Sequence, residues 1–323
     1  MFKNILYPIV ILLLLTTAPI SGNEQLERIQ FINTKYENDC SIIHFTCISE
    51  AMNGRAIKAW VVLPPAYTSE TQQTFPVLYA LHGRGAPYDT YSKMSRLHED
   101  LIDMPMIIAG FDADEASWYL DSPVVHESQF TTFFFDEFLP AVETQWRVNG
   151  ERAISGFSMG GFGALHFALT KPDKFSSVSG LSSALQPARL VGESAIRNDF
   201  IKLLGHEDPD TSILELANRL EQQILSDNPF PPIYQHCGTE DGLIEFSRDF
   251  TKRMVNTNAT IMERFYIETS ADSIDKKKYS AYATEHTIRF KAIESPGGHD
   301  WTFWHSNING ILNFHYRHFL NGQ

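Results

Sequence analysis

The segment Ala153–Leu165 constrains the fold more than any other, because it sets a Gly-x-Ser-x-Gly pattern between a short apolar strand and a helix. In that setting Ser158 must lie on a very sharp turn with a strained backbone. Gly156 and Gly160 flank it because any side chain there would collide with the opposite limb of the turn. The turn exposes the Ser158 hydroxyl and places the Met159 amide at a helix N-terminus, facing the position of a developing oxyanion. The pattern predicts a nucleophilic serine, and the alternative is a glycine-rich turn with an incidental serine.

Apolar runs alternate with helical patterns along most of the chain. We expect strands over residues 41–49, 56–63, 75–81, 104–111, 153–156, 176–181, 232–237 and 288–295. Helices are expected over residues 130–146, 162–170, 212–225, 243–255 and 301–320. The first two strands are joined by Asn53-Gly54, which favours a hairpin turn. The alternation that follows predicts an α/β fold with a mostly parallel central sheet and helices on both faces.

Two segments are longer than a simple crossover between strands requires, residues 186–228 and 257–287. The chain has no internal repeat and no linker rich in proline, glycine or serine. Residues 23–323 are therefore expected to form a single domain, from which these two segments depart as excursions over the carboxyl edge or the flank of the sheet.

The N-terminus has the pattern of a secretory signal peptide. Lys3 supplies a positive charge, Ile5–Leu15 is almost wholly apolar, and small residues lead up to Gly22. The apolar run is shorter than the roughly 20 residues that a membrane-spanning helix needs. We therefore expect residues 1–22 to be removed after export to the periplasm or the extracellular space, with no stable membrane insertion afterwards.

The chain is acidic, with a formal net charge of −13. Since the expected leader holds one lysine and no acidic residue, its removal would lower this charge by one unit, to −14. No basic stripe is present, so nucleic acid and anionic membrane surfaces are poor candidate partners.

The three cysteines, Cys40, Cys47 and Cys237, form no Cys-x-x-Cys pair, which argues against a zinc or redox site. Cys40 and Cys47 could form a disulfide in an oxidising compartment. Alternatively, they lie on opposite faces of one strand, because their spacing is odd, and cannot meet. Cys237 ends an apolar strand and is expected to be a buried, unreactive thiol.

A serine nucleophile needs a base, and the base needs an orienting acid. Asp241 is the candidate acid, because it follows the strand expected at 232–237 and precedes Gly242 in the turn. Glu240 and Glu245 are its rivals.

His299 is the candidate base, since it lies on a glycine loop between the last strand and the last helix. His305 and His236 are the alternatives. The order serine, acid, histidine along the chain is the one that α/β-hydrolases use.

The second half of an oxyanion hole is expected in the loop Leu81-His82-Gly83-Arg84-Gly85, which offers backbone amides at Gly83 and Arg84. His82 precedes the nucleophile in the chain and is interpreted as a loop-packing residue rather than the base.

Several motifs together resemble the esterase D / putative esterase family. They are Leu81-His82-Gly83, Ser117-Trp118-Tyr119 with Asp121-Ser122, Gly156-Phe157-Ser158-Met159-Gly160-Gly161, Cys237-Gly238 through Asp241, and Gly297-Gly298-His299-Asp300-Trp301 with Trp304. The family includes S-formylglutathione hydrolases, tributyrin, feruloyl and enterochelin esterases, and the antigen 85 mycolyltransferases.

The resemblance covers about residues 50–316. It implies an α/β-hydrolase fold, a catalytic triad of Ser158, Asp241 and His299, and oxyanion amides at Met159 and Arg84. Several relatives have a small or apolar residue where this chain has Arg84.

The expected activity is that of a secreted serine carboxylesterase that forms an acyl-enzyme and uses no metal or cofactor. His82, Trp118, Tyr119 and Trp301 are candidate pocket residues for a small neutral ester. Two other functions stay open, acyl transfer to a sugar or lipid alcohol and a non-catalytic binding module on the same fold.

Overall fold

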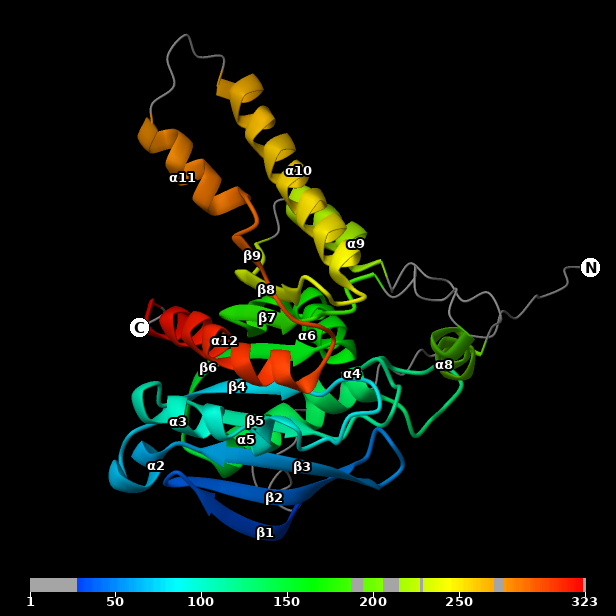
Figure 1. Ribbon diagram of the computed structural model, residues 1–323, viewed down its shortest axis with the longest axis vertical. Coiled ribbons are helices and arrows are strands. Elements are labelled where there is room, and N and C mark those ends of the chain that lie inside the picture. Colours follow the sequence, from blue (N-terminus) through cyan, green and yellow to red (C-terminus); the bar gives the residue numbers. More distant parts are fainter. Residues whose placement is uncertain (1–27, 187–193, 206–214, 227–228, 270–275, 322–323) are drawn as a thin grey trace, which may run out of the picture.

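The computed structural model describes residues 28–186, 194–205, 215–226, 229–269 and 276–321. The expected leader, residues 1–22, lies outside these ranges. The described chain is built on a nine-stranded sheet with the order β1-β2-β3-β5-β4-β6-β7-β8-β9 (Figure 1). The strands are β1 Ile29–Glu37, β2 Cys40–Ser49, β3 Arg55–Leu63, β4 Phe75–Leu81, β5 Ile107–Phe111, β6 Val148–Phe157, β7 Ser177–Leu181, β8 Ile233–Gly238 and β9 Phe290–Ser295.

Strands β5, β4, β6, β7, β8 and β9 pair in parallel, whereas β1, β2 and β3 pair antiparallel at one edge. The strand β3 also joins β5 antiparallel. This confirms the predicted mostly parallel sheet. It also confirms the predicted hairpin, whose turn residues Asn53 and Gly54 both have positive φ, 56° and 79°.

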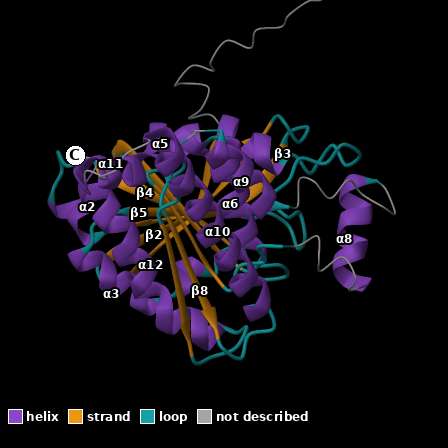
Figure 2. Cartoon of the chain, turned by 90° about the horizontal axis from the view of Figure 1, so that it is seen from above, coloured by secondary structure: helices purple, strands orange, loops and turns teal. Residues whose placement is uncertain are grey.

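Helices cover both faces of the sheet (Figure 2). The longer ones are α3 Ser95–Asp103, α5 Leu139–Gln145, α6 Met159–Thr170, α8 Ser194–Leu204, α9 Leu216–Leu225, α10 Ile244–Thr269, α11 Lys276–His286 and α12 Trp301–Asn321. The short ones are α2 Pro65–Ser69, α4 Phe130–Thr132, the π-helical η2 Phe133–Phe138, and the 3-10 turns η1 Tyr91–Lys93 and η3 Pro172–Lys174. The predicted helix at 130–146 is present as the run α4, η2 and α5.

The two faces of the sheet carry separate cores. One core is packed by α4, η2, α5, α6, α8, α9 and α10, and the other by α3 and α12. Phe111 of β5 lies at the centre of an aromatic cluster on the first face, with ring centroids 5.0 Å from Phe138 and 5.2 Å from Phe133. The aromatic residues of the helix at 130–146 are thus core residues, as the sequence indicates.

Cys40 and Cys47 are free, buried thiols in the two different cores, so they lie on opposite faces of β2. The disulfide interpretation is wrong, because residues an odd number of positions apart on one strand point to opposite faces of the sheet. Cys237 is also free and buried, and burial raises the pKa of its thiol to about 12. It is the unreactive thiol that was expected.

Several parts of the fold differ from the prediction, which included no helix at α3 or α11. The edge strand β1 was not expected, since eight of its nine residues are exposed and it lacks an apolar run. Helix α10 was expected to end at Val255 but continues to Thr269, and with α11 it extends beyond the β9 edge of the sheet (Figure 1). The helix α8 was not predicted within the 186–228 excursion, of which residues 187–193, 206–214 and 227–228 lie outside the described ranges.

In the described part of the chain, no helix is long and apolar enough to cross a membrane.

Candidate active site

The turn between β6 and α6 has the geometry that the glycine pattern predicts. Ser158 has φ 53° and ψ −118°, a conformation that L-residues rarely adopt. A Cβ on Gly156 would lie 2.2 Å from the carbonyl of Gly160, and one on Gly160 would lie 2.1 Å from the Leu81 oxygen. Both glycines are therefore required by close backbone contacts, and the turn is locked against the loop after β4.

The structure brings Ser158, His299 and Asp241 together, although they are far apart in the sequence. His299 Nε2 lies 3.0 Å from Ser158 Oγ. The His299 Nδ1–H group donates to the Asp241 carboxylate, with distances of 3.0 Å to Oδ2 and 3.1 Å to Oδ1. All three follow the carboxyl ends of strands, which meet at one edge of the parallel sheet. This is the hydrogen-bond relay that activates a serine hydroxyl.

Two tightly packed loops place the acid beside the base. After β8, the Thr239 amide donates to Ser295 O at 2.9 Å, and the Glu240 amide donates to Gly297 O at 3.0 Å. A side chain on Gly238 would collide with the Gly297 carbonyl at 2.1 Å. Glycine at 238 thus allows the two loops to pair closely enough for the acid and the histidine to meet.

The histidine is also fixed from its other side by the start of α12. Asp300 Oδ1 accepts the Phe303 amide at 2.9 Å, which satisfies one of the free N–H groups of the first helical turn. Trp304 presents its ring at 86° to the His299 imidazole, with centroids 5.2 Å apart.

The rival acids and bases lie elsewhere. Glu240 is exposed, and Glu245 pairs with Arg248 at 2.7 Å on the surface. His305 reaches Ser95 at 3.5 Å, and His236 reaches Ser295 at 2.8 Å. None of these four contacts Ser158.

The environment of Asp241 favours its ionised form. Its side chain is fully buried, and burial by itself raises the pKa of a carboxyl. The hydrogen bond from His299, the Ser182 hydroxyl beside the carboxylate and the Leu243 amide, the last at 2.8 Å, outweigh this cost and lower the pKa of Asp241. The carboxylate therefore stays charged and can orient the imidazole.

The loop after β4 lies against the serine and is held by His82. A Cβ on Gly83 would stand 3.4 Å from Ser158 Cβ. His82 Nε2 accepts the Ala113 amide at 3.0 Å, so the proton is on Nδ1, which donates to Gly83 O at 2.9 Å. Since the C=O and N–H of a trans peptide point in opposite directions, this bond turns the Arg84 N–H away from the His82 ring. Burial lowers the pKa of His82, so the ring is a neutral structural group, as expected.

The other half of the expected oxyanion hole, Met159, is the first residue of α6. Its amide belongs to the first helical turn and therefore has no partner within the helix.

A model of the Esterase family, described as "Putative esterase", matches residues 49–315 of this chain. The chain belongs to this family. An esterase of Mycobacterium tuberculosis (strain CDC 1551 / Oshkosh) is 30% identical over 184 residues, which is 52% of this chain and 38% of the relative. The chain thus matches well under half the length of that relative. An acetyl esterase of Caldicellulosiruptor saccharolyticus is 26% identical over 251 residues, 73% of this chain and 81% of the relative.

Solved structures of the same fold align with a larger part of this chain. A ferulic acid esterase aligns with a TM-score of 0.65 and 23% identity over 88% of this chain and 100% of its own. An S-formylglutathione hydrolase from Staphylococcus aureus aligns with a TM-score of 0.66 and 17% identity, over 86% and 99% of the two chains. At these identities the likeness shows the fold, the α/β-hydrolase type that the motifs indicate.

Three of the four candidate pocket residues are buried and do not reach solvent. His82, Trp118 and Tyr119 are each at most 1% exposed. Trp118 and Tyr119 both have positive φ, 52° and 58°, and the Tyr119 hydroxyl donates to His82 O at 2.8 Å. His82 belongs to the loop after β4, Tyr119 supports that loop, and Trp118 packs against Phe162 and Phe200. Their burial contradicts the expectation that they line a pocket.

Trp301 is the candidate that reaches solvent, with 39% exposure. Its ring meets Phe157 edge to face at 6.0 Å, and Phe157 stacks on Trp304 at 5.0 Å. An aromatic surface thus lies beside His299 on the α12 side of the site.

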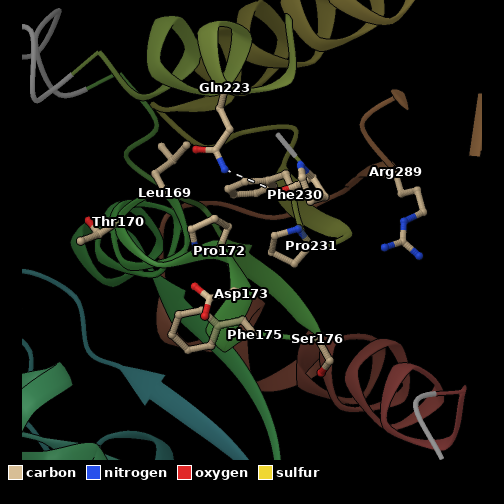
Figure 3. Close-up of a pocket in the computed structure, with 11 residues that line it drawn as sticks. Leu169, Thr170, Pro172, Asp173, Phe175, Ser176, Gln223, Phe230, Pro231 and Arg289 are labelled. Carbon is tan, nitrogen blue, oxygen red and sulfur yellow. Dashed lines mark hydrogen bonds between the residues drawn. The ribbon is translucent and has the colours of Figure 1, made fainter. Parts of the chain in front are cut away.

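A groove of about 630 Å³ lies at the other end of the sheet (Figure 3). It is lined by the end of α6, by Phe175 and Ser176 before β7, and by Phe230 and Pro231 before β8. Because these residues stand at the amino ends of the strands, the groove is separate from the serine. No group of three metal-binding side chains occurs among the described residues.

One feature of the site gave no signal in the sequence. The Arg84 side chain pairs with Asp199 of α8, 115 positions away, and Asp199 belongs to no motif. Only the folded structure shows that this acid lies beside the oxyanion loop.

Proposed function

We propose that this chain is a serine carboxylesterase that hydrolyses small neutral esters through an acyl-enzyme on Ser158. The relay from Ser158 to His299 to Asp241, on a strained turn at a helix N-terminus, is the observation that carries the proposal. Family membership and the names of the related esterases support it.

In the proposed mechanism, His299 Nε2 takes the proton of Ser158 as its oxygen attacks the ester carbonyl carbon. The negative charge on the carbonyl oxygen is stabilised by the backbone amides of Met159 and Arg84. His299 then gives the proton to the leaving alcohol as the carbon–oxygen bond breaks. Asp241 holds the imidazole tautomer and stabilises the imidazolium that forms.

The acyl-enzyme is resolved by water. His299 removes a proton from the water, whose oxygen adds to the acyl carbon, and returns that proton to Ser158 as the acid leaves. Apart from the ester and water, every group in these steps belongs to the chain itself.

The decisive experiment replaces Ser158 with alanine in the purified chain. Hydrolysis of p-nitrophenyl acetate should fall by about 10⁴-fold or more, while the circular dichroism spectrum stays unchanged. A fluorophosphonate probe should label the wild type and not the variant. Ser306→Ala, an exposed serine on α12, serves as the control and should keep full activity. Near-normal turnover by Ser158→Ala, or a binding-only protein with no turnover in the wild type, would contradict the proposal.

For the substrate, we propose short-chain esters without charge. Trp301 offers one exposed aromatic surface, and the acidic chain repels anions at long range. In a p-nitrophenyl panel from acetate to palmitate, rates should fall with chain length and be nearly independent of salt. An optimum at palmitate, or preference for an anionic ester at low salt, would contradict this. Adding an alcohol tests acyl transfer, which would appear as a new ester product.

We also propose that residues 1–22 direct export. The charge, apolar run and small residues at the N-terminus support this. Expression of the full chain, followed by cell fractionation and N-terminal sequencing, should give an exported form that begins at Asn23. A cytosolic protein that keeps Met1 would overturn it.

A further inference from the structure

The Arg84 side chain links the loop after β4 to helix α8. Its Nε donates to Asp199 Oδ2 at 2.6 Å, and a terminal nitrogen donates to Oδ1 at 2.9 Å. The Asp199 side chain is 8% exposed and the Arg84 side chain 31%. A two-point contact of this kind fixes orientation as well as distance. It therefore restrains the same residue whose backbone amide is the proposed second oxyanion donor.

Asp199 also contacts the support behind that loop. The Trp118 indole N–H donates to Asp199 Oδ2 at 3.4 Å. The next residue, Tyr119, donates its hydroxyl to the His82 carbonyl. One buried carboxylate thus lies between the loop and the residues that hold it from behind.

The helix α8 lies outside the layers of helices that cover the sheet (Figure 2). Contacts other than the Asp199 carboxylate hold it in place. The rings of Phe200 and Trp118 lie 4.9 Å apart, and Ser122 Oγ donates to Leu203 O at 2.5 Å. Removing the charge of Asp199 should therefore leave α8 attached while it releases Arg84.

We propose that Asp199 is a positioning residue of the oxyanion hole, which holds the Arg84 backbone amide in place through the Arg84 side chain and so couples helix α8 to the reaction. This inference rests on the proposed serine-esterase function. A mobile amide would weaken stabilisation of the oxyanion, which forms only in the transition state, and would leave binding of the uncharged ester almost unchanged.

The first test is Asp199→Asn, which keeps the size of the side chain and removes its charge. With p-nitrophenyl acetate, kcat should fall by about 10- to 100-fold and KM should change by less than about 3-fold. Inhibition by an alkyl trifluoromethyl ketone, whose adduct with Ser158 carries an oxyanion, should weaken by a similar factor. A purely structural role would not weaken the inhibitor in proportion to kcat.

The second test is a double-mutant cycle with Arg84→Met. The two single variants should lose similar factors in kcat, and the double variant should be no worse than either, because both changes break the same link. If the losses multiply, the two residues act independently and the proposal fails.

A matched control is Glu143→Gln, which breaks another two-point ion pair. The Glu143 carboxylate of α5 binds Arg152 of β6 at two points, through Nε to Oε1 and through a terminal nitrogen to Oε2 at 2.7 Å. Arg152 lies five residues before the end of that strand, away from the serine. This variant should lose thermal stability and keep kcat.

Asp199→Asn with unchanged kcat, or with a raised KM and normal kcat, would overturn the inference. Neither outcome would touch the proposed function, which depends on the loss of wild-type hydrolysis in Ser158→Ala.

Discussion

The substitution Asp241→Asn tests the geometry of the relay most directly, because it changes one atom and no volume. In the structure, Asp241 Oδ1 accepts the Leu243 amide at 2.8 Å, and both carboxylate oxygens face His299 Nδ1 at 3.0 and 3.1 Å. The Leu243 N–H can only donate, so the asparagine oxygen must stay on that side. Its NH₂ group then faces the imidazole.

This arrangement favours the wrong tautomer of the histidine. The NH₂ group replaces Oδ2, the oxygen 3.0 Å from His299 Nδ1, so a donor faces Nδ1 there and favours the form whose proton is on Nε2, the atom 3.0 Å from Ser158 Oγ. A protonated Nε2 cannot take the serine proton. The opposite orientation of the asparagine amide would place its NH₂ group beside the Leu243 N–H. That buried donor would then have no acceptor, at a cost of about 1–3 kcal/mol.

We therefore expect kcat for p-nitrophenyl acetate to fall by about 10⁴-fold, which corresponds to roughly 5.4 kcal/mol in the activation barrier. Glu240→Gln is the matched control, since Glu240 is the exposed neighbour, and it should stay within about 2-fold of the wild type. Circular dichroism should show that both variants are folded. A loss below about 10-fold for Asp241→Asn, or a larger loss for Glu240→Gln, would refute the assignment of the acid.

Two further predictions follow from the packing. Gly160→Ala puts a methyl group 2.1 Å from the Leu81 oxygen, so it should destabilise the fold by about 1–3 kcal/mol or more and abolish hydrolysis, whereas Gly242→Ala, with nothing within 4 Å, should do neither. Burial lowers the pKa of both His166 and His315 to about 3. Because unfolded histidine titrates near pH ~6.5, the unfolded chain binds more protons below that pH. The free energy of unfolding should then decrease by up to about 1.4 kcal/mol per histidine for each pH unit from about pH 6.5 toward 3. Urea titrations between about pH 7 and 5 that show constant stability would contradict this, and His315→Gln should reduce the slope.

The central fold and the candidate triad could be predicted because each depends on local patterns. Strand β4 coincides with its apolar run, since a strand buried on both faces leaves a continuous apolar signal. The positions of Asp241 and His299 follow from topology, because the carboxyl ends of parallel strands share one edge.

The rest could not be predicted, for identifiable reasons. Strand β1 is stabilised by backbone pairing with β2 rather than by apolar burial, so its exposed side chains leave no pattern. Helix α10 carries no proline or glycine after Val255 that would end it, and its continuation to Thr269 depends on neighbours such as α9 and α11. The contact between Arg84 and Asp199 joins residues 115 positions apart, and no local periodicity encodes it.

The aromatic residues near the motifs show why residue type alone misplaces a binding surface. Trp118 and Tyr119 were expected in the pocket, yet successive positive φ values of 52° and 58° accompany their burial. Backbone strain of this kind costs about 1–3 kcal/mol per residue and persists only where the surrounding structure enforces it. Ser158 and Ser182, with φ of 53° and 49°, are strained in the same way at the ends of β6 and β7. The other four non-glycine residues with positive φ among the described residues are asparagines and aspartates, Asn38, Asp39, Asn53 and Asp114, which tolerate this conformation better than most residues. Ser158 and Tyr119 thus bear strain that their residue types do not favour. The Tyr119 hydroxyl bonds to His82 O, as the Asp199 carboxylate binds the Arg84 side chain, so both contacts restrain the loop of the proposed oxyanion hole.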